Sequence, residues 1–197
     1  MKTKSYFSFI IVGFLLLGMN VYGQETKFID GRDGKEYKIL YIGKQVWMGQ
    51  NLNYEMGNSW AYGDKKRNSN QLGRLYTYDA ALKACPDGWH LPNDKEWQEL
   101  IDYYGGDLTA GLALRIDGTS SFNADYGGFM TKDGEFLDMG DDANFWTATS
   151  CDDKDAWRCY IDRGFNSVVQ DYFNKSGALS IRCVRDVANS DVQAEKL

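Results

Sequence analysis

Four cysteines, Cys85, Cys151, Cys159 and Cys183, constrain the fold of this chain more than any other feature. An even number of cysteines in an exported chain favours disulfides, and four of them allow three pairings. Cys151 and Cys159 flank a short polar turn between two aromatic segments, and this spacing predicts a local bridge that leaves Cys85 to pair with Cys183. In the chain-entropy model the local loop contributes about 2.5 kcal/mol and the long loop about 4.7 kcal/mol.

Export itself is predicted from residues 1–23. Two lysines near the start precede an apolar stretch from Phe7 to Met19, and small residues come before Gln24, which is the organisation of a secretory signal peptide. The stretch is too short to span a bilayer comfortably, and no later segment is long and apolar enough. No lipobox cysteine lies near the cleavage site. We therefore expect a secreted, periplasmic or cell-surface protein without a transmembrane segment after cleavage.

The charge of the mature chain excludes one class of partner. Removing the leader takes away two of the 22 Lys and Arg and none of the 28 Asp and Glu, which moves the net charge from −6 to about −8. Nucleic acid is not an expected partner, because phosphate binding needs clustered positive charge. The chain is 43% hydrophobic, enough to build a core in a single domain, expected over residues 24–186. The polar tail, residues 187–197, is predicted to be disordered.

The first half of the domain combines strands and helices. Period and turn residues predict an opening hairpin from strands at 37–42 and 45–52, and then a long loop at 53–73 that contains Trp60 and Tyr62. A helix is predicted from Thr77 to Cys85, with the cysteine on its buried face. Further helices are expected after Pro92 and over 108–114, the first of them with a capping box formed by Asn93 and Glu96.

From Phe122 the period changes to two, which is typical of strands. Short strands are predicted at 145–150, 156–162, 168–173 and 179–184, separated by turns rich in Asp, Gly, Asn and Lys. Cys159 shares a predicted core-facing side with Trp157 and Ile161, and Cys183 shares one with Leu179 and Ile181. With 21 Gly and only 2 Pro, the composition suits a loop-rich α+β fold.

Three ordered segments resemble one known family, the Fibrobacter succinogenes major paralogous domain family. The first runs from Asp33 to Tyr54 and contains Gly-Lys-Gln-Val-Trp-Met-Gly-Gln-Asn-Leu-Asn. The second runs from Gly73 to Trp97 and contains Ala-Cys-Pro-Asp-Gly-Trp-His-Leu-Pro. The third comprises Phe-Trp-Thr-Ala-Thr-Ser from Phe145 and Ser-Gly-Ala-Leu-Ser-Ile-Arg-Cys-Val-Arg-Asp, which ends at Asp186. Together they span nearly the whole mature chain.

The resemblance implies a fold similar to C-type lectins and formylglycine-generating enzymes. It implies two helices flanking a twisted antiparallel sheet, termini close together, and a long loop region that carries ligand contacts in lectin-like relatives. The family pattern has cysteines at the places of Cys85 and Cys183, so it implies the long bridge. Cys151 and Cys159 have no such support, and their pairing rests on spacing alone. No catalytic residue carries over.

Metal and catalytic chemistry find little support. The lectin calcium motifs are absent, and acidic runs at 138–142 and 152–155 are typical of solvated turns, so calcium is not an expected ligand. There is no C-x-x-C motif for zinc or redox chemistry, and His90 is the only histidine. We assign His90 a structural hydrogen-bonding role and expect no cofactor and no enzymatic activity.

Aromatic and polar residues support a binding role better. Trp and Tyr stack on sugar rings, and neighbouring Asp and Asn bond hydroxyl groups. Trp47, Trp89, Trp97 and Trp157 lie in periodic or motif segments and are assigned to the core, whereas Trp146 and Tyr126 remain binding candidates. The predicted ligand-binding residues are Trp60, Tyr62, Asp141, Asp142 and Asn144.

Three functions follow from these residues. The first is a binding module that recognises glycan or protein through the 53–73 loop and the 138–144 region. The second is a structural or adhesive surface protein without a small-ligand site. The third is a cryptic enzyme that depends on His90.

Overall fold

The computed structural model describes residues 27–187, which form an α+β domain. Its first sheet has four antiparallel strands in the order β1-β2-β3-β11. Their bounds are β1 Lys27–Ile29, β2 Glu36–Ile42, β3 Gln45–Met48 and β11 Val184–Asp186. The predicted opening hairpin is confirmed as β2 and β3. The first and last strands of the described chain, β1 and β11, form the two opposite edges of this sheet.

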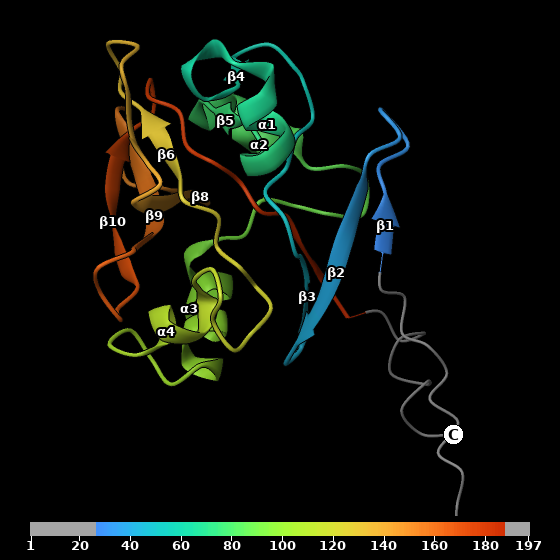
Figure 1. Cartoon of the computed structure of the whole chain (residues 1–197), viewed down its shortest axis with the longest axis vertical. Helices are drawn as coiled ribbons and strands as arrows, with labels where there is room; N and C mark the ends of the chain where they lie inside the picture. The colour runs from blue at the N-terminus through green and yellow to red at the C-terminus, as the bar shows by residue number, and fades with distance from the viewer. Residues whose placement is uncertain (1–26, 188–197) are drawn as a thin grey trace, which may run out of the picture.

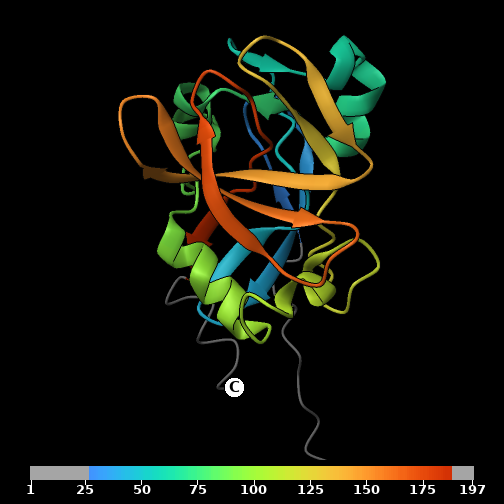
Figure 2. The ribbon, with the colours of Figure 1, turned by 90° about the vertical axis from the view of Figure 1, so that its left-hand side faces the viewer.

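The second sheet has five strands in the order β10-β9-β8-β6-β7, and Figure 2 views it face on. Its strands are β6 Gly127–Met130, β7 Phe136–Met139, β8 Asp142–Ser150, β9 Asp155–Asp162 and β10 Val169–Asn174. All neighbours are antiparallel except β6 and β8, which share one parallel bridge between Gly128 and Ala143. The predicted α+β class is confirmed, and the domain has two main sheets where one twisted antiparallel sheet was expected.

The helices lie at two ends of the molecule (Figure 1). At one end are α1 Lys66–Leu72, α2 Tyr78–Ala84 and a two-stranded sheet of β4 Ser59–Trp60 with β5 Leu75–Tyr76. At the other end are α3 Asp94–Tyr103 and α4 Ala110–Leu114. The predicted capping box of α3 is confirmed, since Asn93 accepts from the Glu96 backbone and Glu96 accepts from the Asn93 backbone.

The segment predicted as a long loop contains short elements instead. Besides β4 and α1 it includes a 3-10 turn, η1 Tyr62–Asp64. Helix α1 buries only Ser69, so its sequence lacks the apolar stripe from which a helix is predicted. Gly73 ends the helix with φ 74°, and a Cβ there would lie 2.9 Å from the carbonyl oxygens of Asn51 and Leu52. Glycine is required at this close approach.

An aromatic core joins the two sheets through α3. Trp97 on α3 packs against Trp47 on β3 at 4.9 Å between ring centroids, and against Phe145 on β8 at 5.3 Å. All three side chains are fully buried. A second core cluster lies beneath α2 and includes Trp146, whose indole N–H donates to the Tyr76 carbonyl at 2.8 Å. Trp146 is therefore a core residue and not a binding candidate.

One predicted disulfide is confirmed and the other is wrong. Cys85 at the end of α2 is bonded to Cys183, with a sequence separation of 98 and 5.9 Å between their Cα atoms. Cys151 and Cys159 are free thiols, one exposed and one buried. In the β8–β9 pair Cys159 lies opposite Phe145, whereas the Cys151 N–H donates to the carbonyl of Asp155. Four residues of strand separate those positions, about 13 Å, too far for a bridge.

Two further expectations need correction. The predicted strand at 179–184 is regular only from Val184, because residues 178–180 bridge in turn to Met130, Tyr76 and Phe145. This segment runs between the sheets and joins no single ladder. Trp157 is half-buried and pairs across the strands with the exposed Tyr172, so it does not share the core with Cys159.

Candidate functional site

Residues 53–74, the segment around α1, line two pockets, and Trp60 belongs to the smaller one. This Trp60 pocket has a volume of about 190 Å³ and combines the half-buried indole with the charged side chains of Glu55, Asp64, Lys66 and Arg74. Arg74 is fixed there, since its guanidinium donates to the Ser59 hydroxyl at 3.1 Å and carbonyl at 2.9 Å. An aromatic face rimmed by charged donors and acceptors suits a polyhydroxylated ligand.

The larger pocket, of about 340 Å³, is rich in side-chain amides. A free side-chain amide offers both a donor and an acceptor to a hydroxyl group. The Asn51 amide is buried and already paired, because its N–H donates to the Leu72 carbonyl at 3.0 Å and its oxygen accepts from Arg182 at 2.7 Å. Tyr37 also lines this amide pocket, and its hydroxyl accepts the Asn53 N–H at 3.0 Å. Burial raises the pKa of Tyr37 to about 12, so its phenol stays protonated. The amides that line the pocket are Gln50, Asn51, Asn53, Asn70 and Gln71.

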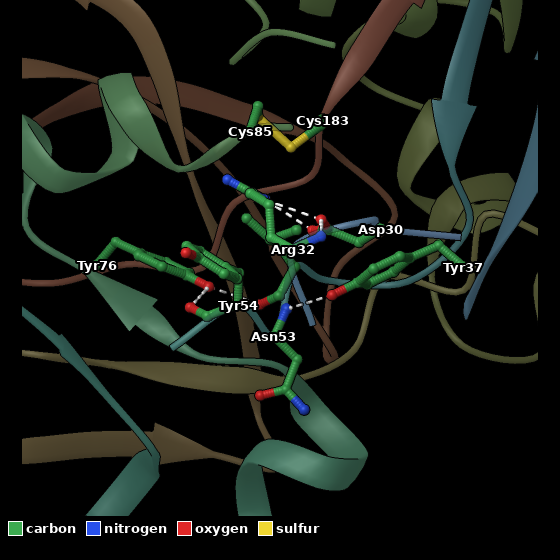
Figure 3. The surroundings of a disulfide bond; sticks show 9 residues. Asp30, Arg32, Tyr37, Asn53, Tyr54, Tyr76, Cys85 and Cys183 are labelled. Atoms are coloured by element: carbon green, nitrogen blue, oxygen red, sulfur yellow. Dashed lines mark hydrogen bonds and ion pairs between the residues drawn. A yellow bond between two sulfur atoms is a disulfide. The ribbon is translucent and has the colours of Figure 1, made fainter. Parts of the chain in front are cut away.

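A network beside the disulfide holds the start of this segment (Figure 3). The Arg32 guanidinium lies 3.8 Å from the centre of the Tyr54 ring and forms an ion pair with Asp30 at 2.7 Å. The hydrogen bond from Arg32 holds the pKa of Asp30 below its ordinary value. On the other side, the Tyr76 hydroxyl donates to the Tyr54 carbonyl at 2.8 Å. The backbone at 53–54 is therefore anchored from both sides.

Tyr62 contributes to the fold near the Trp60 pocket. Its ring packs against Phe136 of β7 at 5.2 Å between centroids, and both belong to a small apolar cluster that also includes Trp60. It does not line the Trp60 pocket. Trp60 is therefore the predicted aromatic that the structure brings together with polar side chains.

The predicted acidic residues lie elsewhere, at the start of β8. Asp141 is exposed and Asp142 is half-buried, but Asn144 is 1% exposed and its side-chain oxygen accepts from Arg158 at 3.0 Å. Asn144 is thus unavailable to a ligand. Burial is the first cause that raises the pKa of Asp142, followed by the charges of Asp162 and Asp138. Within residues 27–187, no group of three or more His, Cys, Asp or Glu is arranged to hold a metal ion.

His90 is tied to the beginning of α3. Its Nε2 lies 2.6 Å from a carboxylate oxygen of Glu96, the residue that also closes the capping box. Its backbone pairs with Val184 of β11 in both directions, at 2.9 Å for each hydrogen bond. These contacts support the structural role assigned to this residue.

Among the described helices, none is long and apolar enough to cross a membrane.

Sequence reasoning missed the amide pocket. Gln50, Asn51 and Asn53 follow β3, whereas Asn70 and Gln71 lie on α1, so their meeting depends on the tertiary fold. The signal that was available is the density of amides at 50–53 and 68–71.

Comparison with known proteins gives one result. The family model described as the Fibrobacter succinogenes major domain matches residues 40–185. No curated protein and no solved structure shows a significant match.

Proposed function

The chain belongs to the Fibrobacter succinogenes major domain family, and from that premise we propose that it is an exported, non-catalytic module that binds glycan. The observation that carries this proposal is the Trp60 pocket, in which an accessible indole is surrounded by charged hydrogen-bonding groups. The amide pocket on the same segment adds donors and acceptors suited to sugar hydroxyls. A C-type-lectin-like fold, with ligand contacts in this loop region, is part of the proposal.

Export is supported by the leader-like residues 1–23 and by the disulfide between Cys85 and Cys183. Disulfides persist in oxidising compartments and are rare in the cytosol. The predicted cleavage before Gln24 falls outside the described residues. Recovery of the mature protein with residues 1–23 still attached would contradict export by this leader.

A glycan array tests the binding proposal. The wild-type protein and Trp60→Ala are compared with and without calcium, and we expect calcium-independent binding by the wild type. Loss of the indole should weaken binding at least about fivefold, since stacking and burial of an aromatic face typically contribute more than about 1 kcal/mol.

Tyr172→Ala is the matched control, because this tyrosine is 67% exposed on β10 and lies outside both pockets. It should bind as the wild type does, and circular dichroism should show that both variants are folded. If no glycan binds the wild type, or if Trp60→Ala binds equally well, glycan recognition at Trp60 is wrong. The alternative of an adhesive or structural surface protein would then take its place.

A further inference from the structure

A third pocket lies away from the 53–74 segment, where α4 meets the ends of the five-stranded sheet. It has a volume of about 450 Å³ and is lined by Arg115, Ile116, Asp117, Tyr126 and Arg163. Arg115 caps the end of α4, Tyr126 precedes β6, and Arg163 follows β9. We call this the two-arginine pocket.

Main-chain hydrogen bonds fix its walls. The Gly140 N–H donates to the Tyr126 carbonyl at 2.9 Å, and the Arg163 N–H donates to the Asp141 carbonyl at 2.9 Å. Arg115 forms a parallel bridge with Ala124. Three segments that are far apart in sequence are thus held together by backbone contacts.

The charges in this pocket are unusual for an acidic chain. Within residues 27–187, neither Arg115 nor Arg163 forms an ion pair with a carboxylate. Arg163 makes one long hydrogen bond of 3.5 Å to the Gly140 carbonyl. Both guanidinium groups therefore keep donors that a ligand can use.

The charges of Arg115 and Arg163 both affect the pKa of Tyr126. Its side chain is buried, and burial raises the pKa of its phenol, while Arg115 and Arg163 act in the opposite direction. The hydroxyl therefore stays protonated at neutral pH. Tyr126 and the two arginines all line this pocket.

We propose that the two-arginine pocket binds the carboxylate of a small hydroxylated ligand, such as a uronic acid. Guanidinium groups bind carboxylates through paired, charge-assisted hydrogen bonds. Asp117 can accept from a ligand hydroxyl, and Ile116 offers an apolar surface to the ring. Two arginines and one aspartate give the lining a net charge of one, which matches a singly charged carboxylate better than a phosphate dianion.

This inference goes beyond the proposed function, because it concerns different residues and a different ligand charge. The two-arginine pocket shares no lining residue with the Trp60 pocket or the amide pocket. A failure at one site therefore leaves the other standing.

Calorimetric titration of the full mature chain tests it, with galacturonate, trigalacturonate, galactose and inorganic phosphate as probes. We expect both uronates to bind if the free acid is sufficient, or the trisaccharide alone if the ligand is a polysaccharide. Affinity should fall with added salt. Arg115→Gln and Arg163→Gln should each weaken binding at least about tenfold, since hydrogen bonds between charged groups contribute about 1.5–3 kcal/mol.

One variant serves as the control. Arg67→Gln removes an exposed arginine of α1 that lies outside the pocket. It should bind uronate as the wild type does, and circular dichroism should show that all variants are folded. Galactose binding that is equal to uronate binding and equally weakened by Arg115→Gln and Arg163→Gln, a preference for phosphate, no uronate binding, or full affinity in folded Arg115→Gln and Arg163→Gln would each overturn the proposal.

Discussion

At the scale of single residues, Arg182 is a fully buried cation placed between both sheets. Its guanidinium donates to the Asn51 side-chain oxygen at 2.7 Å, to the Asn123 carbonyl at 3.2 Å and to the Phe122 carbonyl. The Asp125 carboxylate lies 3.6 Å away. Burial lowers the pKa of Arg182 to about 10, while Asp125 acts in the opposite direction. The group is therefore still charged at neutral pH, and its contacts tie residues 122–125 to the last segment.

The free cysteines permit a direct prediction at the same scale. A thiol reagent should modify one thiol per native chain, at Cys151, and a second only after unfolding, at Cys159. Cys159 has no exposed surface. Burial, followed by the charge of Asp152, raises the pKa of the Cys151 thiol, so its modification should accelerate as the pH rises above the ordinary thiol range.

Intact mass of the same sample, prepared from exported protein, checks both thiols and the predicted first residue, Gln24. Cys151→Ser is the control and should abolish the native reaction while leaving the reaction after unfolding. A wild-type chain with no reactive thiol under either condition would show that Cys151 and Cys159 are bonded.

At the scale of elements, the β8–β9 pair carries two like charges directly opposite each other, Asp142 and Asp162. Opposed like charges destabilise a sheet, but exposure to solvent weakens the effect. Because the pKa of Asp142 is raised in the folded state, its ionised form is less stable there than in the unfolded chain. The contribution of Asp142 to the free energy of unfolding therefore falls as the pH rises from below the ordinary carboxyl pKa to above the raised pKa.

Asp142→Asn should remove this loss. We expect a gain of about 0.5 kcal/mol in the free energy of unfolding at pH 7, measured by urea denaturation, and no gain near pH 3, where the wild-type carboxyl is protonated. Asp153→Asn, in the exposed turn between the same strands, is the control and should change neither value. A loss of stability at pH 7 would contradict this account and would indicate that the carboxylate has a stabilising partner.

At the scale of the whole molecule, the disulfide links the two halves of the chain. Cys85 ends α2, and Cys183 immediately precedes β11 of the first sheet. The bond closes a loop that contains α3, α4 and the whole five-stranded sheet. It constrains the unfolded chain strongly because this loop is long.

Replacing both cysteines, Cys85→Ala with Cys183→Ala, should cost about 4–5 kcal/mol of unfolding free energy. Urea denaturation of the oxidised wild type and the double variant measures this difference. Cys151→Ala is the matched control and should stay within about 0.5 kcal/mol of the wild type, since its thiol is exposed and free. A double variant as stable as the wild type would refute a major role for the bond.

The sequence by itself determined features whose causes are local. The β2–β3 hairpin, the capping box of α3 and most strands of the second sheet depend on residues within a few positions of each other. Turn residues and hydrophobic period report such interactions directly. Trp60, the aromatic at the candidate site, was identified because it lies in a segment that has no hydrophobic period.

Only the tertiary structure decided what depends on register and on distant contacts. Spacing alone predicted a bridge between Cys151 and Cys159, but the β8–β9 register places Cys159 opposite Phe145 and beyond reach. Strand pairing likewise divided the strands between two main sheets and buried Asn144. It also brought Arg115 and Arg163 to one pocket from segments that share no local pattern. Side chains that meet across such distances leave no periodic signal, because the long-range packing of the chain sets their separation.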